Sequence, residues 1–268
     1  MITNYADMGF VRAAACSPKV SIGNPVGNAK QIAESSLRLF DQGVTIGVFP
    51  ELSITGYTSE DLFYSDKLVD ETISALAHLA EKSKLPCLVV GTPWRLRDGR
   101  LLNCAAVISG NRITGMVPKS AHPNHGEFYD LRWFSDGALI NEHINNQKLG
   151  GFQIRVDQLF EIGPCVLGIE LCEDLWSPIN PSTRACLAGA NVIANLSASN
   201  ELITKAEYRR SLIHLTSAKN LCGYIYCGAG PTESSKDIVF GGHCLISECG
   251  QMLTEGDRFS FDEQIITA

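Results

Sequence analysis

The sequence PCVLGIELCEDLWSPINPSTRACLAGANVIANLSAS, residues 164–199, contains two apolar runs on either side of a helical stretch. Residues 164–171 and 191–196 are short and rich in Val, Ile and Leu, which is typical of buried strands. Residues 183–188 lie between them and predict a helix. A strand, a helix and a second strand in this order indicate an α/β fold, so this stretch sets the fold class.

The same alternation extends in both directions from this stretch. Further strands are predicted at residues 10–16, 44–50, 87–93 and 224–227, and further helices at residues 28–42, 68–84 and 206–221. Two hairpins are also predicted: strands at 103–108 and 112–117 flank Ser109-Gly110-Asn111, and a second hairpin surrounds residues 248–251. Residues 118–150 read as irregular, and so long an irregular stretch is more often functional than idle. We expect one domain over residues 1–268, with a mixed sheet covered by helices.

Composition excludes several classes of protein. Apolar residues make up 45% of the 268 residues and charged residues 19%, which fits a folded enzyme. The net charge of -7 argues against a nucleic-acid partner, since phosphate binding needs clustered Lys and Arg. No apolar run approaches the roughly 20 residues of a membrane span, so no membrane partner is expected.

The ten cysteines do not form a disulfide or zinc pattern. Most lie inside apolar runs, where free Cys behaves as a small hydrophobe, and none has C-x-x-C spacing. Residues 1–10 lack the layout of a signal peptide. We therefore expect a cytoplasmic protein with reduced thiols and no metal site.

Polar residues follow three of the predicted strands. The segments are VFPE (residues 48–51), GIELCED (168–174) and IANLSAS (193–199). In α/β folds ligands bind beyond the carboxyl ends of strands, so side chains at these ends are expected to share one pocket.

Three of the residues near strand ends combine into a plausible catalytic set. Glu51 alone is as well explained as a strand-ending carboxylate, and Lys119, directly after Pro118, as a solvated surface charge. Cys172 differs from the other cysteines because acidic residues surround it at a strand-to-turn junction. A thiol needs a base or a cation to become nucleophilic, a carboxylate can take its proton, and a lysine can stabilise an oxyanion.

Histidine is the usual alternative base for a cysteine nucleophile. The chain has six histidines, and His122, His125 and His143 lie in the irregular stretch. Spacing alone leaves Cys–His chemistry open.

The same segments resemble a known family. FPELSITGY (residues 49–57), Pro118-Lys119 and GIELCEDLW (168–176) look like the Glu, Lys and Cys signature of the nitrilase superfamily. Residues 122–134 (HPNHGEFYDLRWF), 195–210 (NLSASNELITKAEYRR) and 229–246 (AGPTESSKDIVFGGHCLI) resemble the amino-terminal glutaminase domain of glutamine-dependent NAD synthetases. The resemblance covers nearly the whole chain. It implies a four-layer α-β-β-α sandwich of two mixed sheets, the nitrilase or carbon-nitrogen hydrolase fold.

The resemblance also assigns roles in catalysis. It makes Glu51 the general base, Lys119 the catalytic lysine and Cys172 the nucleophile that forms a glutamyl thioester. Asp130 stands where the superfamily often places a second, supporting glutamate, and Glu127 is the other candidate for that supporting carboxylate.

Substrate contacts are implied in the same way. Ser199 and Lys205 match positions that contact glutamine, and Tyr57 and Glu173 match further pocket positions, with Glu173 suited to the α-amino group. His125 stands where the family usually has a tyrosine beside glutamine.

The family's second domain has no counterpart in the sequence. A synthetase domain would carry an S-G-G-x-D-S loop, and no such loop is present. ATP, Mg and deamido-NAD are therefore expected only in a synthetase domain outside this chain, with no cofactor in this domain. The expected function is hydrolysis of L-glutamine to supply ammonia for NAD formation by that partner domain, and the resemblance implies a homo-oligomer.

Two alternatives stay open. One is a stand-alone nitrilase-type amidase that acts on another small amide, which the synthetase-like segments after Ser197 argue against. The other is an assembly domain with little activity when isolated.

Overall fold

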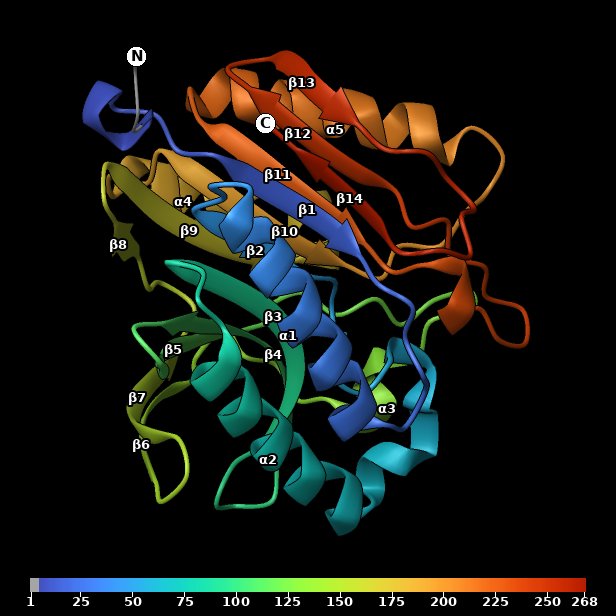
Figure 1. Ribbon diagram of the computed structural model, residues 1–268. Helices are drawn as coiled ribbons and strands as arrows, with labels where there is room; N and C mark the ends of the chain where they lie inside the picture. Colours follow the sequence, from blue (N-terminus) through green and yellow to red (C-terminus); the bar gives the residue numbers. More distant parts are fainter. Residues whose placement is uncertain (1–4) are drawn as a thin grey trace.

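The computed structural model describes residues 5–268 as two β-sheets packed face to face (Figure 1). Residues 1–4, part of the segment examined for a signal peptide, lie outside the described residues. The larger sheet has eight strands in the order β14-β1-β2-β3-β4-β5-β7-β6, and the smaller has six in the order β13-β12-β11-β10-β9-β8. Both sheets mix parallel and antiparallel pairs, so the expectation of two mixed sheets is confirmed.

The strands of the larger sheet come mainly from the first half of the chain. They are β1 (Ala13–Ser17), β2 (Ile46–Val48), β3 (Cys87–Arg95), β4 (Leu101–Ser109), β5 (Arg112–Pro118), β6 (Asn141–Asn146), β7 (Gly150–Arg155) and β14 (Gln264–Thr267). Strand β14 returns from the end of the chain to pair with β1, and Ala13 N donates to Ala268 O at 2.8 Å.

The smaller sheet is built from the second half. Its strands are β8 (Phe160–Ile162), β9 (Cys165–Leu171), β10 (Val192–Ser197), β11 (Gly223–Gly228), β12 (Cys244–Glu248) and β13 (Gln251–Glu255). Strands β9, β10 and β11 are parallel neighbours, so their carboxyl ends lie at one edge. The unit that sets the fold class is therefore the centre of this sheet.

Alternate residues of both sheets fill the space between them. Ala15, Val48 and Val89 of the larger sheet meet Ile169, Leu196 and other aliphatic residues of the smaller one, and these five are less than 3% exposed. Fully burying such a Val, Leu or Ile side chain contributes about 1.5–3 kcal/mol. This apolar layer holds the two sheets together.

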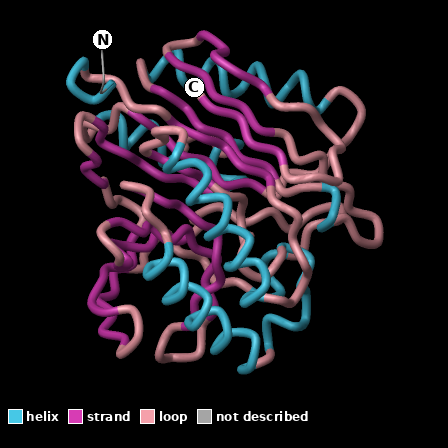
Figure 2. The backbone as a smooth tube through the Cα atoms, viewed as in Figure 1, coloured by secondary structure: helices cyan, strands magenta, loops and turns pink. Residues whose placement is uncertain are grey.

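Helices cover the outer face of each sheet, which completes the four layers (Figure 2). Helices α1 (Pro25–Asp41) and α2 (Asp66–Lys82) pack on the larger sheet, and α4 (Pro181–Leu187) and α5 (Lys205–Asn220) on the smaller. Helix α1 begins at Pro25, and the Asn24 side chain caps it by accepting from Gly27 N at 3.0 Å. The fold-class prediction of an α-β-β-α sandwich is confirmed.

Short helical segments lie between these elements. They are α3 (Asp130–Trp133) and the 3-10 segments η1 (Tyr5–Met8), η2 (Tyr57–Tyr64), η3 (Cys172–Trp176) and η4 (Pro231–Glu233). Three of them, η2, η3 and η4, follow strand ends, where the polar segments of the sequence also lie.

The structure differs from the sequence-based expectation mainly at the β6–β7 hairpin and at β8. The hairpin falls partly inside residues 118–150, which we expected to be irregular, and β8 was not predicted. The sequence of β6, NEHINN, lacks apolar alternation because β6 is a half-exposed edge strand. Residues 119–140 are irregular apart from the single turn of α3.

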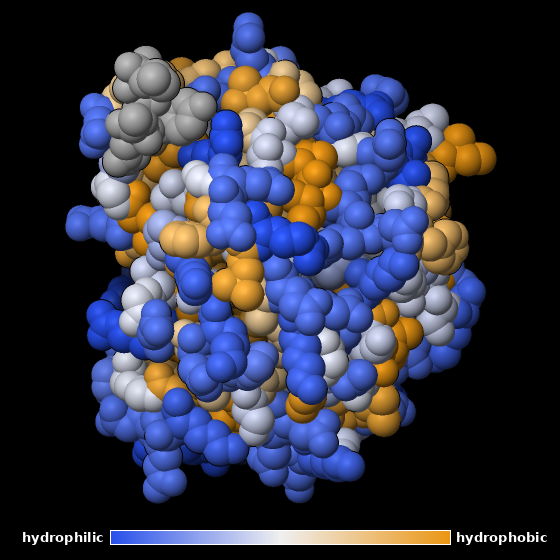
Figure 3. All heavy atoms as spheres, in the orientation of Figure 1, coloured by the Kyte–Doolittle hydropathy of each residue, from blue (hydrophilic) through white to orange (hydrophobic). Residues whose placement is uncertain are grey.

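The surface in Figure 3 is mostly hydrophilic, with apolar groups scattered over it. Within residues 5–268, no helix combines the length and the apolar character needed to cross a membrane.

Candidate active site

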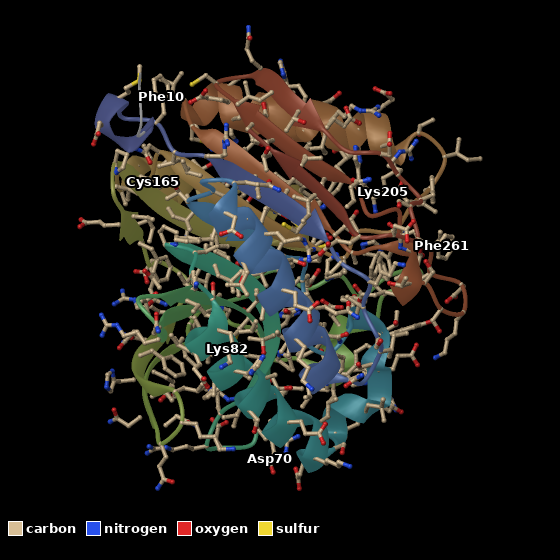
Figure 4. All side chains as sticks on the ribbon, in the orientation of Figure 1. Phe10, Asp70, Lys82, Cys165, Lys205 and Phe261 are labelled. Atoms are coloured by element: carbon tan, nitrogen blue, oxygen red, sulfur yellow. The ribbon has the colours of Figure 1, made fainter. Side chains whose placement is uncertain are left out.

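The three candidate catalytic residues follow strands of both sheets. Glu51 comes shortly after β2, Lys119 directly after β5, and Cys172 directly after β9. Their exposed fractions are 0%, 1% and 4%. Figure 4 marks the two ends of the smaller sheet, with Cys165 at the start of β9 and Lys205 at the other end. The candidate site lies at the Lys205 end, where the carboxyl ends of β9 and β10 meet.

Glu51 is the centre of a hydrogen-bond network. Its Oε1 accepts from Lys119 Nζ at 2.6 Å and from Asn103 Nδ2 at 2.7 Å. Its Oε2 accepts from the backbone N–H of Ala198 at 2.7 Å. Ala198 follows β10, so the Glu51 carboxylate joins the two sheets directly.

A close approach of two backbones holds Glu51 in place. Gly91 N donates to Pro50 O at 3.2 Å, and a Cβ on Gly91 would lie 2.2 Å from Leu52 N. Only glycine fits there. Leu52 itself has a φ of 52°, which turns the chain away immediately after Glu51. The sequence signal for this contact is a lone glycine inside the apolar strand CLVVGTPWR, which does not reveal the contact without the structure.

Lys119 is bound by a second carboxylate. Its Nζ donates to Asp130 Oδ2 at 2.7 Å as well as to Glu51. Burial disfavours the ammonium ion, but Asp130 and Glu51 outweigh that effect and raise the pKa of Lys119 well above its usual range. Burial likewise opposes ionisation of Asp130, yet Lys119 and the hydrogen bonds around it lower the pKa of Asp130 to about 2. The three groups therefore form a buried ion cluster.

The two candidates for the supporting carboxylate occupy different places. Asp130 contacts Lys119, and Tyr57 donates its hydroxyl proton to Asp130 Oδ1. Glu127 instead accepts from the amide of Asn200. The geometry assigns the position beside Lys119 to Asp130.

Cys172 is held in an unfavourable backbone conformation. Its φ is 42°, in the left-handed region that non-glycine residues rarely adopt, at the turn from β9 into η3. Burial and the Glu51 carboxylate raise the pKa of the Cys172 thiol, whereas Lys119 and the Ala198 N–H favour the thiolate. The resting thiol therefore keeps its proton, and a base must remove it for attack.

Asp174 fixes the turn that carries Cys172. Its Oδ2 accepts from Leu171 N at 2.9 Å, and its Oδ1 accepts from Ser120 Oγ at 2.7 Å and Ala121 N at 2.8 Å. It thus joins the Cys172 turn to the segment directly after Lys119. The sequence showed Asp174 only as part of an acidic junction and not as this link.

Lys205 lies between two aromatic rings. Its Nζ is 5.2 Å from the centre of the Trp176 ring and 5.9 Å from that of Phe128. The Lys205 ammonium also donates to Asn200 Oδ1. Burial lowers the pKa of Lys205, while the charges of Cys172 and Glu173 oppose that shift. A cation in this position is suited to bind an anionic group of a substrate.

The other candidate substrate contacts lie around Lys205. Ser199 Oγ accepts from Arg209 at 3.3 Å. The rings of His125 and Phe128 pack edge to face, with 6.2 Å between their centres. Glu173 is half-buried and acts electrostatically on both Cys172 and Lys205. Tyr57 differs from these candidate substrate contacts, because its hydroxyl donates a hydrogen bond to Asp130.

The histidine alternative loses support from the geometry. His122 Nδ1 lies 3.4 Å from Asp130 Oδ2, and His143 pairs with Gln153 on the exposed β6–β7 hairpin. The largest effects on the Cys172 thiol, after burial, come from Glu51, Lys119, the Ala198 N–H and Glu173. Among the described residues, no cluster of three or more His, Cys, Asp or Glu is placed to hold a metal ion.

A buried carboxylate, lysine and cysteine at the shared end of two sheets define a class of hydrolase. A family model described as carbon-nitrogen hydrolase matches residues 12–268, and the chain belongs to this family. Within it, the chain is 41% identical over 258 residues to the glutamine-dependent NAD(+) synthetase of Mycobacterium tuberculosis strain H37Rv. That match covers 94% of this chain and 37% of the relative, so the chain spans little more than a third of the relative's length.

Among solved structures, the chain is similar to a glutamine-dependent NAD(+) synthetase and, at lower identity, to an amidase. A glutamine-dependent NAD(+) synthetase from Cytophaga hutchinsonii superposes with a TM-score of 0.87 at 25% identity, over 96% of this chain and 42% of that one. A point mutant of the Nesterenkonia AN1 amidase, from the nitrilase superfamily, gives a TM-score of 0.77 at 17% identity, over 96% and 89%. At that identity the similarity to the amidase shows the fold alone.

Proposed function

We propose that this domain hydrolyses the carboxamide of L-glutamine to glutamate and ammonia through a thioester on Cys172. The single observation that carries the proposal is the buried Lys119–Glu51 ion pair, which acts electrostatically on the Cys172 thiol. The similarity over 94% of the chain to a glutamine-dependent NAD(+) synthetase supports glutamine as the substrate.

The residues present account for each step of the reaction. Glu51 takes the proton of Cys172 while Sγ attacks the carboxamide carbon, and the carbonyl π electrons move to the oxygen. The Lys119 ammonium and backbone N–H groups stabilise that oxyanion. The oxyanion then collapses, the carbon–nitrogen bond breaks, and the proton held by Glu51 passes to the departing nitrogen, which leaves as ammonia.

The second half of the reaction reuses the same base. Glu51 removes a proton from water as the water oxygen attacks the thioester carbon. Glutamate leaves and the proton returns to Cys172 Sγ. Because Asp130 keeps Lys119 charged, the ammonium remains available to the oxyanion in both halves.

Recognition of glutamine follows from the charges near Cys172. Lys205 is suited to the α-carboxylate of glutamine, and Glu173 to its α-amino group. Ser199 and His125 lie beside them, and Tyr57 contributes through Asp130.

The wider role is part of the same proposal. The ammonia would supply a synthetase domain outside this chain, which would use ATP, Mg and deamido-NAD to form NAD, in a cytoplasmic homo-oligomer. The 37% share of the relative's length supports a further domain as partner. This domain itself would need no cofactor.

Glutamate release from L-glutamine tests the proposal. The wild-type chain is expected to release glutamate and Cys172→Ala to release none, with Cys249→Ser, which alters an exposed cysteine, as the matched control. Faster hydrolysis of other small amides than of glutamine would instead support a stand-alone amidase. Turnover that appears only after a synthetase domain is added would support an assembly role with little isolated activity.

A further inference from the structure

A further buried carboxyl group lies beside the catalytic network and has no part in the reaction described above. Glu233 ends η4 and is 0% exposed. Its Oε2 accepts from Tyr57 N at 2.6 Å, and its backbone carbonyl accepts from Thr58 Oγ1 at 2.8 Å. Its Oε1 has no hydrogen-bond partner within residues 5–268.

Glu233 reaches the catalytic lysine through a short relay. It fixes the backbone of Tyr57, whose hydroxyl donates to Asp130, and Asp130 binds Lys119. The Tyr57 ring makes two edge-on aromatic contacts that hold it in place. Its centre is 6.3 Å from the centre of the Phe128 ring and 5.7 Å from that of Phe240. Glu233 is therefore the first residue in a series of hydrogen bonds that passes through Tyr57, Asp130 and Lys119 and ends at Glu51.

The surroundings of Glu233 favour its neutral form. An unpartnered carboxylate oxygen is costly to bury as an ion, because no donor replaces the lost water. Burial raises the pKa of Glu233 to about 8, the Tyr57 N–H opposes this, and the charge of Glu51 adds to it.

No cation in the neighbouring described segments offsets that effect. Lys236, on the loop after η4, pairs with Glu60 at the surface. Lys19 lies next to Val20, which donates its N–H to Thr232 beside Glu233, and Lys19 pairs with the exposed Asp262. The charged group that acts directly on Glu233 is Glu51.

We propose that Glu233 is a positioning residue that, as the neutral acid, holds Tyr57 against Asp130, and that its ionisation disables the site. The ionised form would place a second negative charge beside Glu51 and so disfavour both the Cys172 thiolate and the oxyanion. This inference rests on the proposed hydrolysis, and it assigns the alkaline limit of that reaction to one carboxyl group.

The pH dependence of kcat tests the inference with two variants. In the wild type, kcat is expected to fall about tenfold between about pH 7 and about pH 9, since one group titrates near the middle of that interval. Glu233→Gln keeps the shape and hydrogen bond of the neutral acid, so its kcat should stay within about threefold over the same interval. Glu233→Ala releases Tyr57 and should lower kcat at every pH with little change in KM.

Infrared spectroscopy keeps the inference separate from glutamine hydrolysis. The difference spectrum between wild type and Glu233→Gln at neutral pH should contain the C=O band of a protonated carboxyl group. Labelling of the Cys172 peptide by iodoacetamide should rise more steeply with pH in Glu233→Gln than in the wild type. Both measurements remain valid if glutamine is not the substrate.

Two results would overturn the assignment. One is an alkaline fall of kcat in a folded Glu233→Gln variant that equals the fall in the wild type or, if glutamine is not turned over, an equal rise of Cys172 labelling with pH in the two proteins. The other is the absence of the carboxylic acid band from the wild type.

Discussion

The carboxylate of Glu51 and the backbone N–H of Ala198 form a 2.7 Å hydrogen bond that connects the two sheets of the sandwich. Glu51 follows a strand of the larger sheet and Ala198 a strand of the smaller one. The Ala198 N–H also favours the thiolate form of Cys172. The same backbone N–H therefore binds the base and favours the thiolate of the nucleophile, so the site depends on how the two sheets pack.

Replacing the base should remove activity while the side chain keeps its size. The single oxygen of Glu51→Gln can accept either from Lys119 or from Ala198, which bind different oxygens of Glu51, and the amide cannot take a proton from Cys172. We expect kcat to fall by about two to four orders of magnitude, the usual contribution of a general base. Steady-state glutamate release measures this, with the exposed Glu34→Gln as control. A near-normal rate in Glu51→Gln would remove Glu51 from the role of base.

Removing the cation should damage stability as well as activity. Lys119→Met leaves Glu51 and Asp130 buried without their shared partner. Breaking a buried ion pair in this way typically costs about 3–5 kcal/mol of unfolding free energy. Urea denaturation checks the value, and Lys30→Met, at an exposed position of α1, is the control. Equal unfolding free energies for the two variants would contradict the ion cluster described for the site.

The contact at Gly91 predicts that one methyl group disrupts the Glu51 turn. A Cβ on Gly91 would lie 2.2 Å from Leu52 N and 2.3 Å from Pro50 O, both backbone atoms that cannot move away cheaply. Gly91→Ala is expected to lower both the melting temperature and kcat. At Gly223 the nearest atom would be at 3.5 Å, so Gly223→Ala should be tolerated. Matching melting temperatures for the two variants would show that the backbones do not approach so closely.

Glu233 predicts a pH dependence of stability. Its pKa is raised from 4.5 to about 8 in the folded chain, so between these values the native state binds a proton that the unfolded state has lost. The free energy of unfolding contributed by this group is therefore highest below about pH 4.5 and falls as pH rises, by about 1.4 kcal/mol per pH unit. Above about pH 8 the contribution is constant.

Denaturation of Glu233→Gln across this interval measures the effect. The variant has no proton to lose at this position, so its stability should decline less steeply than that of the wild type. Glu34→Gln, which changes an exposed carboxyl group, should keep the wild-type slope. The same slope in all three proteins would mean that Glu233 is ionised throughout.

The sequence allowed much of the fold to be predicted, and it indicated that the candidates Glu51, Lys119 and Cys172 follow strand ends, where the structure also has them. Strands such as β9 and β10 are continuous apolar runs, and the polar residues that follow them mark the end of the sheet where the site lies. The half-exposed strand β6 carried no such pattern, because its pairing depends on β7 rather than on burial. It was missed for that reason.

The supporting contacts of the site were harder to predict, because they depend on the way distant segments pack. Asn103 lies near the start of β4 and donates to Glu51, and Asp174 accepts from Ser120 and Ala121. Nothing in their local sequence distinguishes them from ordinary polar residues. The sequence alone could not decide whether Asp130 or Glu127 contacts Lys119. That depends on how the irregular segment is placed in three dimensions.

Covalent capture of the nucleophile tests whether Cys172 attacks the side chain of glutamine. A glutamine analogue with a diazoketone in place of the carboxamide would alkylate the attacking thiol with loss of dinitrogen, and peptide mass spectrometry would locate the adduct. We expect one adduct, on Cys172, that excess L-glutamine prevents and that Cys172→Ala lacks. An adduct on another of the ten cysteines, or labelling of Cys172 that glutamine does not slow, would show that Cys172 is not the nucleophile for glutamine.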